Sequence, residues 1–154
     1  MTTANTLATL GNGPAFSVYS ATTQTLSSNV WLKVSLNTKV FDTNSNFDAT
    51  TNYRFTPTVA GYYQVNGAIY FRAAANADQV MVSIYKNGSE FRRGNNSAMT
   101  DLATTQVVSE LIYMNGTTDY LELYGYSYNG TTVQMYYATS FATSYMSASL
   151  VRGT

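Results

Sequence analysis

The segment from Asp42 to Asp48 contains the residues whose types and spacing come closest to a metal site. Its sequence, Asp-Thr-Asn-Ser-Asn-Phe-Asp, places oxygen ligands at alternate positions, as a calcium-binding loop does at its start. Such a loop needs a glycine at its sixth position and a bidentate glutamate at its twelfth, where this chain has Phe47 and Tyr53. We therefore interpret the segment as an Asx turn between strands and expect no metal there.

Acid and base groups for catalysis are also sparse. The chain has no His and no Cys, so the most useful acid-base group and the thiolate nucleophile are both missing. Asp119 and Glu122 are a candidate carboxylate pair, but on a strand they point to opposite faces and do not converge on a substrate. The basic pair Arg92-Arg93 is typical of a solvated hairpin end. We expect no catalytic residues, no cofactor and no metal, which indicates that the protein is not an enzyme.

Net charge and composition restrict the partners. Eight Lys and Arg balance eight Asp and Glu, so no positive field is available to attract nucleic acid or an anionic membrane. Charged residues make up only 10% of the chain, against about 25% in an average globular protein. The 23 Thr, 15 Ser and 14 Asn must therefore supply most of the polar surface. We expect neither nucleic acid nor a membrane as a partner.

The first residues carry no export signal. Met1 to Thr6 lack both a basic start and a continuous apolar run, so we expect no signal peptide, and no stretch is apolar enough to span a bilayer. The low-charge surface is nonetheless typical of proteins that work outside cells. Synthesis in a host cytoplasm followed by release as part of a particle would reconcile the two observations.

The length of 154 residues fits a single domain. Residues 1–13 are small and polar and end in a turn-forming cluster, so they predict an N-terminal arm in which Leu7 and Leu10 are the large apolar side chains after Met1. In residues 14–154, short apolar runs recur between turn signals and no helical period is sustained. This pattern predicts one all-β domain.

Alternating residue types indicate which strand faces are buried. Between residues 62 and 72 one set of alternate side chains is apolar and should face the core, while Tyr62, Gln64, Asn66 and Tyr70 face outward. Two later strands alternate in the same way. The expected core residues are Tyr63, Val65, Ile69, Phe71, Val80, Val82, Ile84, Leu121 and Leu123.

Three Asn-Gly pairs begin at Asn87, Asn115 and Asn129, each between two strand-like runs. Asn-Gly suits the positive φ angles of a two-residue type I′ hairpin. We therefore predict three hairpins. They join strands near 80–86 and 89–93, near 106–114 and 118–127, and near 118–127 and 132–138.

The strand that begins near residue 120 has tyrosines on the face opposite its leucines. Tyr120, Tyr124, Tyr126 and Tyr128 form this mostly aromatic ladder. A single Tyr is often an ordinary strand residue with a solvated hydroxyl, but a large exposed aromatic patch usually marks a contact. We therefore predict that the four tyrosines form a subunit interface.

Ordered motifs from Pro14 to Val151 resemble those of a known family. They include Ala15-Phe16-Ser17-Val18-Tyr19, Tyr53-Arg54-Phe55-Thr56-Pro57-Thr58-Val59-Ala60-Gly61-Tyr62-Tyr63, Ser83-Ile84-Tyr85-Lys86-Asn87-Gly88, the segment from Leu111 to Leu123 and the closing strand from Tyr145 to Val151. Together they resemble the complement 1q globular-head family, which shares its trimeric jelly roll with tumour necrosis factor. The chain departs from that family because it lacks a collagen-like stem and cysteines, and because Ser147-Ala148-Ser149 replaces an aromatic-Ser-Gly-Phe pattern in the closing strand.

The resemblance implies a jelly-roll β-sandwich of about ten antiparallel strands that forms a homotrimer, with both termini at one end. Stemless variants with Thr- and Asn-rich surfaces are similar to domains of bacteriophage virion proteins. Our main hypothesis is a trimeric capsid decoration protein, or cement protein, on the capsid surface of a phage virion. Leu7 and Leu10 of the arm would then anchor it to the major capsid protein.

The alternative hypothesis is the receptor- or glycan-binding tip of a phage tail fibre. Tyr and Asn side chains and Trp31 would stack on sugars and hydrogen-bond to them. The copy number in purified virions separates the two hypotheses, because a decoration protein is present in hundreds of copies and a fibre in few.

Overall fold

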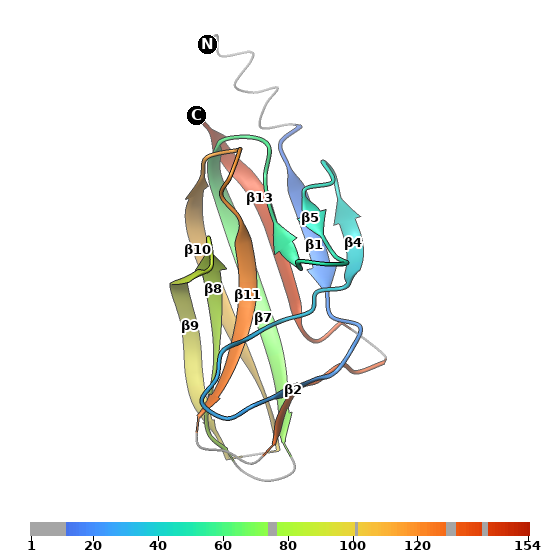
Figure 1. Cartoon of the computed structure of the whole chain (residues 1–154), viewed down its shortest axis with the longest axis vertical. Coiled ribbons are helices and arrows are strands. Elements are labelled where there is room, and N and C mark those ends of the chain that lie inside the picture. Colours follow the sequence, from blue (N-terminus) through green and yellow to red (C-terminus); the bar gives the residue numbers. More distant parts are fainter. Residues whose placement is uncertain (1–11, 74–76, 101, 129–131, 140–141) are drawn as a thin grey trace.

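The computed structural model describes residues 12–73, 77–100, 102–128, 132–139 and 142–154. The regular elements in these ranges are all β-strands, arranged in two antiparallel sheets that pack face to face (Figure 1). None of these residues belongs to a helix of the length and hydrophobicity needed to cross a membrane. The architecture confirms the all-β sandwich that the sequence predicts.

Sheet A has seven strands around the long strand β7 (Gly61–Ala73). In the order of their pairing they are β2 (Gln24–Leu26), β12 (Val133–Met135), β7, β13 (Tyr145–Gly153), β1 (Ala15–Tyr19) and β4 (Thr38–Asp42). β12 pairs with the end of β7 and β13 with its first part, and β10 (Ala103–Met114) pairs with β7 along nearly its whole length. In the pairing of β1 with β13, Ala15 lies opposite Ser149, and the backbone N–H of Leu150 donates to the Pro14 carbonyl at 3.1 Å. The start of β1 and the end of β13 therefore lie at the same end of the sandwich, which we call the terminal end (Figure 1).

Sheet B has six strands. In spatial order they are β5 (Phe47–Asp48), β6 (Arg54–Phe55), β11 (Leu121–Tyr128), β8 (Ala77–Lys86) and β9 (Ser89–Met99), with β3 (Leu32–Lys33) also paired to β11. The long strands β11 and β8 pair over eight residues, from Leu121 opposite Lys86 to Tyr128 opposite Gln79. This pair forms the central part of the sheet.

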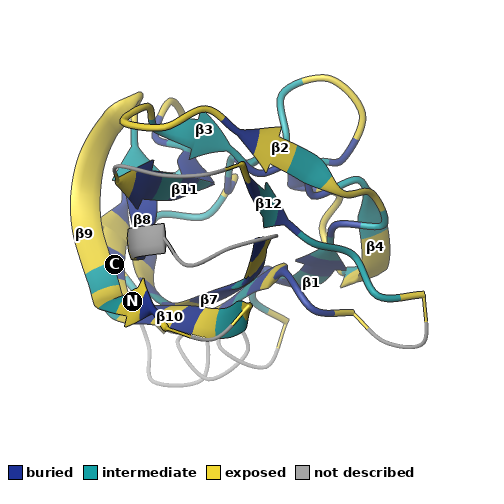
Figure 2. Ribbon diagram, turned by 90° about the horizontal axis from the view of Figure 1, so that it is seen from below, coloured by how far each residue is buried: buried dark blue, intermediate teal, exposed yellow. Residues whose placement is uncertain are grey.

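The core lies between the two sheets, and all nine side chains predicted to face it have 0% exposure. Figure 2 shows buried and exposed positions following one another along β7 and β10. Tyr63 is the one core tyrosine in this set, and its hydroxyl donates to the Val59 carbonyl at 2.8 Å. Burial raises the pKa of Tyr63 to about 12, so the hydroxyl remains a donor at neutral pH.

One of the three predicted Asn-Gly hairpins is confirmed. Asn87 and Gly88 have φ angles of 54° and 79° and connect β8 directly to β9. The prediction at Asn115 is wrong, because Asn115-Gly116 leads from β10 in sheet A to β11 in sheet B. The prediction at Asn129 is also wrong: residues 129–131 lie outside the described residues, but the flanking strands β11 and β12 belong to different sheets.

Candidate functional site

Strand β11 places the four predicted interface tyrosines on or beside the outer face of sheet B. Tyr124, Tyr126 and Tyr128 point away from the core, and Tyr128 is 44% exposed. Tyr120 precedes the strand, and the Arg54 guanidinium lies over its ring, 4.5 Å from the centroid. The structure thus places these residues along one side of the sandwich, and their role as an interface stays a prediction.

Two of these tyrosines pack against aromatic rings of the same chain. Tyr85 of β8 stacks on Tyr124 with ring centroids 3.9 Å apart. Trp31, which precedes β3, lies 5.0 Å from the Tyr126 ring and 5.9 Å from the Tyr85 ring. We call Trp31, Tyr85, Tyr124 and Tyr126 the outer aromatic cluster. Because each ring is half-buried by the others, the cluster fixes the Trp31 segment on sheet B.

An ion pair borders the outer aromatic cluster at Trp31. The Arg93 guanidinium lies 5.4 Å from the Trp31 ring centroid and donates to both carboxylate oxygens of Glu90 at 2.7 Å. These hydrogen bonds from Arg93 hold the pKa of Glu90 below its usual value, although partial burial opposes them. Glu90 therefore keeps its charge and holds Arg93 over the indole.

A second ion pair lies beside Tyr124. The Lys33 ammonium is 3.0 Å from one oxygen of Glu122, and the Tyr124 hydroxyl donates to the other oxygen at 3.4 Å. Burial raises the pKa of Tyr124 to about 12, and the nearby Glu122 charge acts in the same direction. The polar groups around the cluster are therefore engaged within the chain.

The Asp42–Asp48 segment forms turns. The Asp42 carboxylate accepts the backbone N–H groups of Asn46 and Phe47 at 3.0 Å. The Asp48 carboxylate accepts those of residues 50–52, also at 3.0 Å, and these hydrogen bonds hold its pKa well below the usual range. These are the hydrogen bonds of Asx turns. Within the described residues no three or more Asp and Glu side chains come together as a metal site.

Asp119 and Glu122 bind different partners and do not form a carboxylate pair. Asp119 accepts from the Asn87 amide at 2.8 Å and forms an ion pair with Lys86 at 2.9 Å. Burial alone would raise the pKa of Asp119, but its hydrogen bonds from Asn87 and Lys86 lower it. This carboxylate therefore ties the β8–β9 hairpin to the β10–β11 connection, which is a structural role.

The outer face of sheet A carries most of the exposed large apolar side chains of the described residues. Seven of the twelve lie there: Phe41 (48%), Tyr62 (40%), Val107 (52%), Leu111 (48%), Tyr113 (42%), Tyr145 (40%) and Val151 (49%). Six of them lie on β10, β7 and β13, which are adjacent in the sheet, and Phe41 lies on β4, which β1 separates from β13. We call this surface the sheet A face.

The sheet A face is divided into layers along its strands. The terminal band, nearest the terminal end, consists of Tyr62, Leu111, Tyr113 and Val151, and the rings of Tyr62 and Tyr113 are 5.4 Å apart. The distal band consists of Val107 and Tyr145, which lie on either side of Ala68. Between the two bands lies a polar belt of Gln64, Asn66, Ser109, Ser147 and Ser149.

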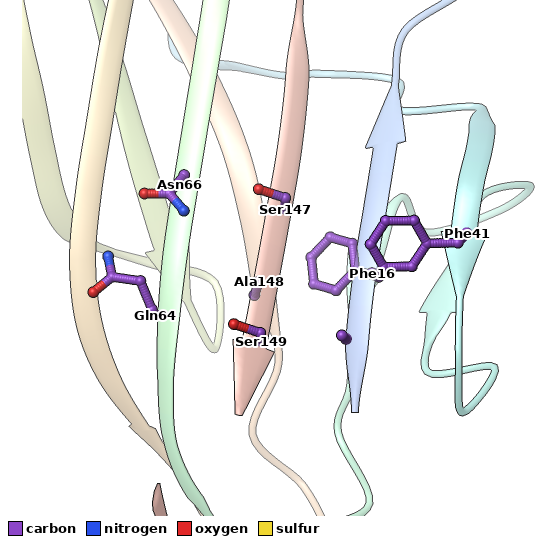
Figure 3. Close-up of a pocket in the computed structure, with 8 residues that line it drawn as sticks. Phe16, Phe41, Gln64, Asn66, Ser147, Ala148 and Ser149 are labelled. Carbon is purple, nitrogen blue, oxygen red and sulfur yellow. The ribbon is translucent and has the colours of Figure 1, made fainter. Parts of the chain in front are cut away.

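The polar belt is hydrogen-bonded and shallowly hollowed. The Gln64 amide donates to the Ser109 hydroxyl at 2.9 Å, and that hydroxyl donates to the Asn66 carbonyl oxygen at 2.9 Å. The side chains of β13 at this level are small, and the belt borders a depression of about 190 Å³ that Phe41 also lines (Figure 3). The belt therefore offers small polar groups and space on a face that is otherwise apolar.

Only part of the sheet A face is predictable from the sequence. The alternation of residue types correctly predicts that Tyr62, Gln64 and Asn66 face outward from β7. The sequence does not indicate the apolar part, because on β10 the exposed Val107 and Leu111 are as apolar as the buried Val108 and Ile112, while polar Gln106 is buried, so that the strand shows no clear polar side. The proposed arm residues Leu7 and Leu10 lie outside the described residues.

Comparisons with known proteins bear on the fold. No protein family model and no curated protein matches the sequence. The structure is similar to the globular domain of zebrafish complement 1qA protein, with a TM-score of 0.63, 14% identity and coverage of 92% of this chain and 99% of that one. Murine APRIL gives a TM-score of 0.66 at 7% identity, covering 90% and 99%, and Eiger TNF from S. frugiperda gives 0.62 at 8% identity, covering 92% and 93%. The chain therefore has the jelly-roll fold of the complement 1q and tumour necrosis factor domains, as its motifs predict.

Proposed function

We propose that this protein is a non-enzymatic structural protein of a bacteriophage virion, a homotrimeric capsid decoration protein whose subunits associate through the sheet A face. The observation that carries the proposal is the gathering of seven exposed large apolar side chains on that one face. Soluble monomers seldom leave such a patch in water, and its burial favours association by roughly 25 cal/mol per Å².

A further copy of the same chain is the partner that this face fits best. The residues of its two bands and of the polar belt are uncharged, although the charged side chain of Arg152 borders the terminal band opposite Tyr62, so most of the face does not select a partner of opposite charge. Association of copies removes the apolar bands of every subunit from water at once. The resemblance to the complement 1q family implies that the number of copies is three.

The exposed fractions favour the sheet A face over the tyrosine ladder on β11 as the subunit contact. In the ladder, Tyr124 and Tyr126 already bury part of their area against Tyr85 and Trp31. On the sheet A face, Leu111 and Val151 are 48% and 49% exposed and have this area left to bury. Association through sheet A therefore gains more from the hydrophobic effect.

The terminal end supplies the attachment to the capsid in this proposal. Since β1 begins at that end, three arms of residues 1–13 would leave a trimer together, with Leu7 and Leu10 available to dock onto the major capsid protein. Three weak attachments linked in one particle gain a large effective concentration. The trimer would thus stand on the capsid surface as a knob.

Light scattering and capsid binding test the proposal in two steps. At micromolar concentration the mass should be three times 16.9 kDa, and a stable monomer would contradict the trimer. Deletion of residues 1–13 should leave the trimer folded, because the first strand begins at Ala15, but should abolish binding to undecorated capsids. Full binding by the shortened trimer would show that the arm is not the anchor.

The outer aromatic cluster favours one second candidate, the glycan-binding tip of a tail fibre. Trp31 and Tyr85 lie beside the Glu90–Arg93 pair, and half-exposed rings next to polar groups suit stacking and hydrogen bonding to sugars. In this case the intact trimer should bind host cells and ignore capsids. Loss of cell binding in Trp31→Ala, with the trimer intact, would support the fibre function over the decoration function.

A further inference from the structure

The two apolar bands of the sheet A face stand on either side of the polar belt on the same three strands. On β7, Tyr62 in the terminal band and Ala68, which lies between the two residues of the distal band, are separated by about 20 Å of extended chain. Gln64 and Asn66 occupy the outward positions between them. A neighbouring copy that covers both bands must therefore cover the belt as well.

Covering the belt removes water from its polar groups. A buried polar group without a partner costs about 1–3 kcal/mol, whereas a paired one is nearly neutral or favourable. Within one chain the Asn66 carbonyl oxygen accepts from Ser109 and the Gln64 amide donates to Ser109. The hydroxyls of Ser147 and Ser149 and the amide N–H groups of Asn66 face outward beside the depression and offer further bonds to a neighbour (Figure 3).

We propose that the polar belt is the layer of the subunit contact that fixes how copies of this chain align, through hydrogen bonds from Gln64, Asn66 and Ser147 to the belts of neighbouring copies. The inference rests on the proposed association through the sheet A face. Apolar bands alone tolerate sliding, because the hydrophobic effect has no direction. A belt of donors and acceptors is satisfied only when belts meet at one level, so a shifted contact leaves them unpaired.

The occupant of the belt is a further copy of the chain. A partner with a charged surface would leave its charges against the uncharged belt and bands, which is unfavourable when water is excluded. The belt carries both donors and acceptors, so it is complementary to itself. Its small serines also allow close approach, and the depression beside Phe41 leaves room for a side chain of the neighbour.

Asn66→Asp tests whether the belt is buried between copies. The new carboxylate can still accept the hydrogen bond from Ser109, so the single chain should fold, as circular dichroism can verify. Copies of a carboxylate brought into one contact repel each other and resist desolvation, so the trimer should dissociate at neutral pH, with a dissociation constant raised about 100-fold. At about pH 4 and below, protonation should restore the trimer, because association then favours the neutral form.

Asn96→Asp is the matched control, because Asn96 is exposed on β9 of sheet B. It should remain trimeric at both pH values by light scattering. Ser147→Asp, in the belt on β13, provides a second variant with the same expected pH dependence if Asn66→Asp does not fold. If the belt variants stay trimeric at neutral pH as the control does, the belt is not in the contact and the inference is overturned.

Asn66→Leu separates pairing from simple burial. If belts pair across copies, this change leaves polar groups of the neighbour unpaired, and the trimer should weaken about 10-fold although apolar area has been added. A trimer that becomes tighter would overturn the pairing. A wild-type chain that is monomeric at all concentrations would instead contradict the proposed function, which keeps the two failures distinguishable.

Discussion

The outer faces of the two sheets both carry aromatic residues, but the rings on sheet B are covered by other parts of the chain to a greater extent than those on sheet A. On sheet B, Tyr124 and Tyr126 are covered by Tyr85 and by Trp31, which is brought in from the segment before β3. On sheet A, Tyr62 and Tyr113 contact each other but remain 40% and 42% exposed. The apolar area left open after the chain has folded, and not aromatic content, therefore identifies the surface suited to association.

The largest expected effect comes from placing one charge on each face. Leu111→Asp on sheet A and Tyr128→Asp on sheet B alter side chains of similar exposure, 48% and 44%. Burying an unpaired carboxylate in a subunit contact is strongly unfavourable, so Leu111→Asp should convert the trimer to a monomer while Tyr128→Asp leaves it intact. Light scattering at micromolar concentration measures both.

The opposite pattern would reverse the comparison. If Tyr128→Asp dissociates the trimer and Leu111→Asp does not, the tyrosine ladder predicted from the sequence is the interface. Thermal melts of both variants provide the control for folding, since each side chain is nearly half exposed and neither change should affect the core.

Trp31→Ala should have an intermediate effect, on stability and not on assembly. It removes the ring that covers Tyr126 and Tyr85, and a half-buried Trp should cost about 2 kcal/mol, less than the loss of a fully buried one. Urea unfolding measures this free energy, and light scattering should still give a trimer. A dissociated but fully stable variant would mean that the outer aromatic cluster belongs to a subunit contact.

The smallest expected effect concerns the Glu90–Arg93 pair beside Trp31. The pKa of Glu90 lies below its ordinary 4.5 in the folded chain, so the pair stabilises the fold above that pH and loses this contribution as the pH falls through the lower folded value. Glu90→Gln should therefore cost about 0.5 kcal/mol at neutral pH, and the difference in free energy of unfolding from the wild type should shrink as the pH falls below 4.5. Urea unfolding of both proteins at several pH values measures this difference. If the difference in free energy of unfolding persists in acid, it comes from packing of the Glu90 side chain and not from the ion pair.

The core-facing side chains could be predicted from the sequence, because apolar and polar residues alternate along the strands that carry them. Tyr63, Val65 and Ile69 repeat every second residue, and this period alone fixes the inward face of a strand. The hairpin at Asn87-Gly88 could likewise be predicted from neighbouring residues alone, because these two residues supply the positive φ angles of the turn.

What the sequence did not reveal depends on contacts between distant segments. Gly116 also has a positive φ, of 72°, but it packs against Ala60 and leads the chain into the other sheet. Whether a strand pairs with its neighbour in sequence is decided by the whole sheet and not by the turn. The contact between Trp31 and Tyr126 joins residues far apart in the chain, and no local pattern indicates that it forms.

The pairing of β1 with β13 has a consequence for how the chain folds as it is made. β1 fits between β4 and β13, and β13 also covers most of one edge of β7, so sheet A stays incomplete until residues 145–153 have left the ribosome. Contacts of such long sequence separation slow folding, typically to the order of milliseconds to seconds. Until then β1 and β7 present open edges that favour pairing with other chains. A chain truncated before Tyr145 should therefore aggregate rather than fold, whichever partner the finished protein binds.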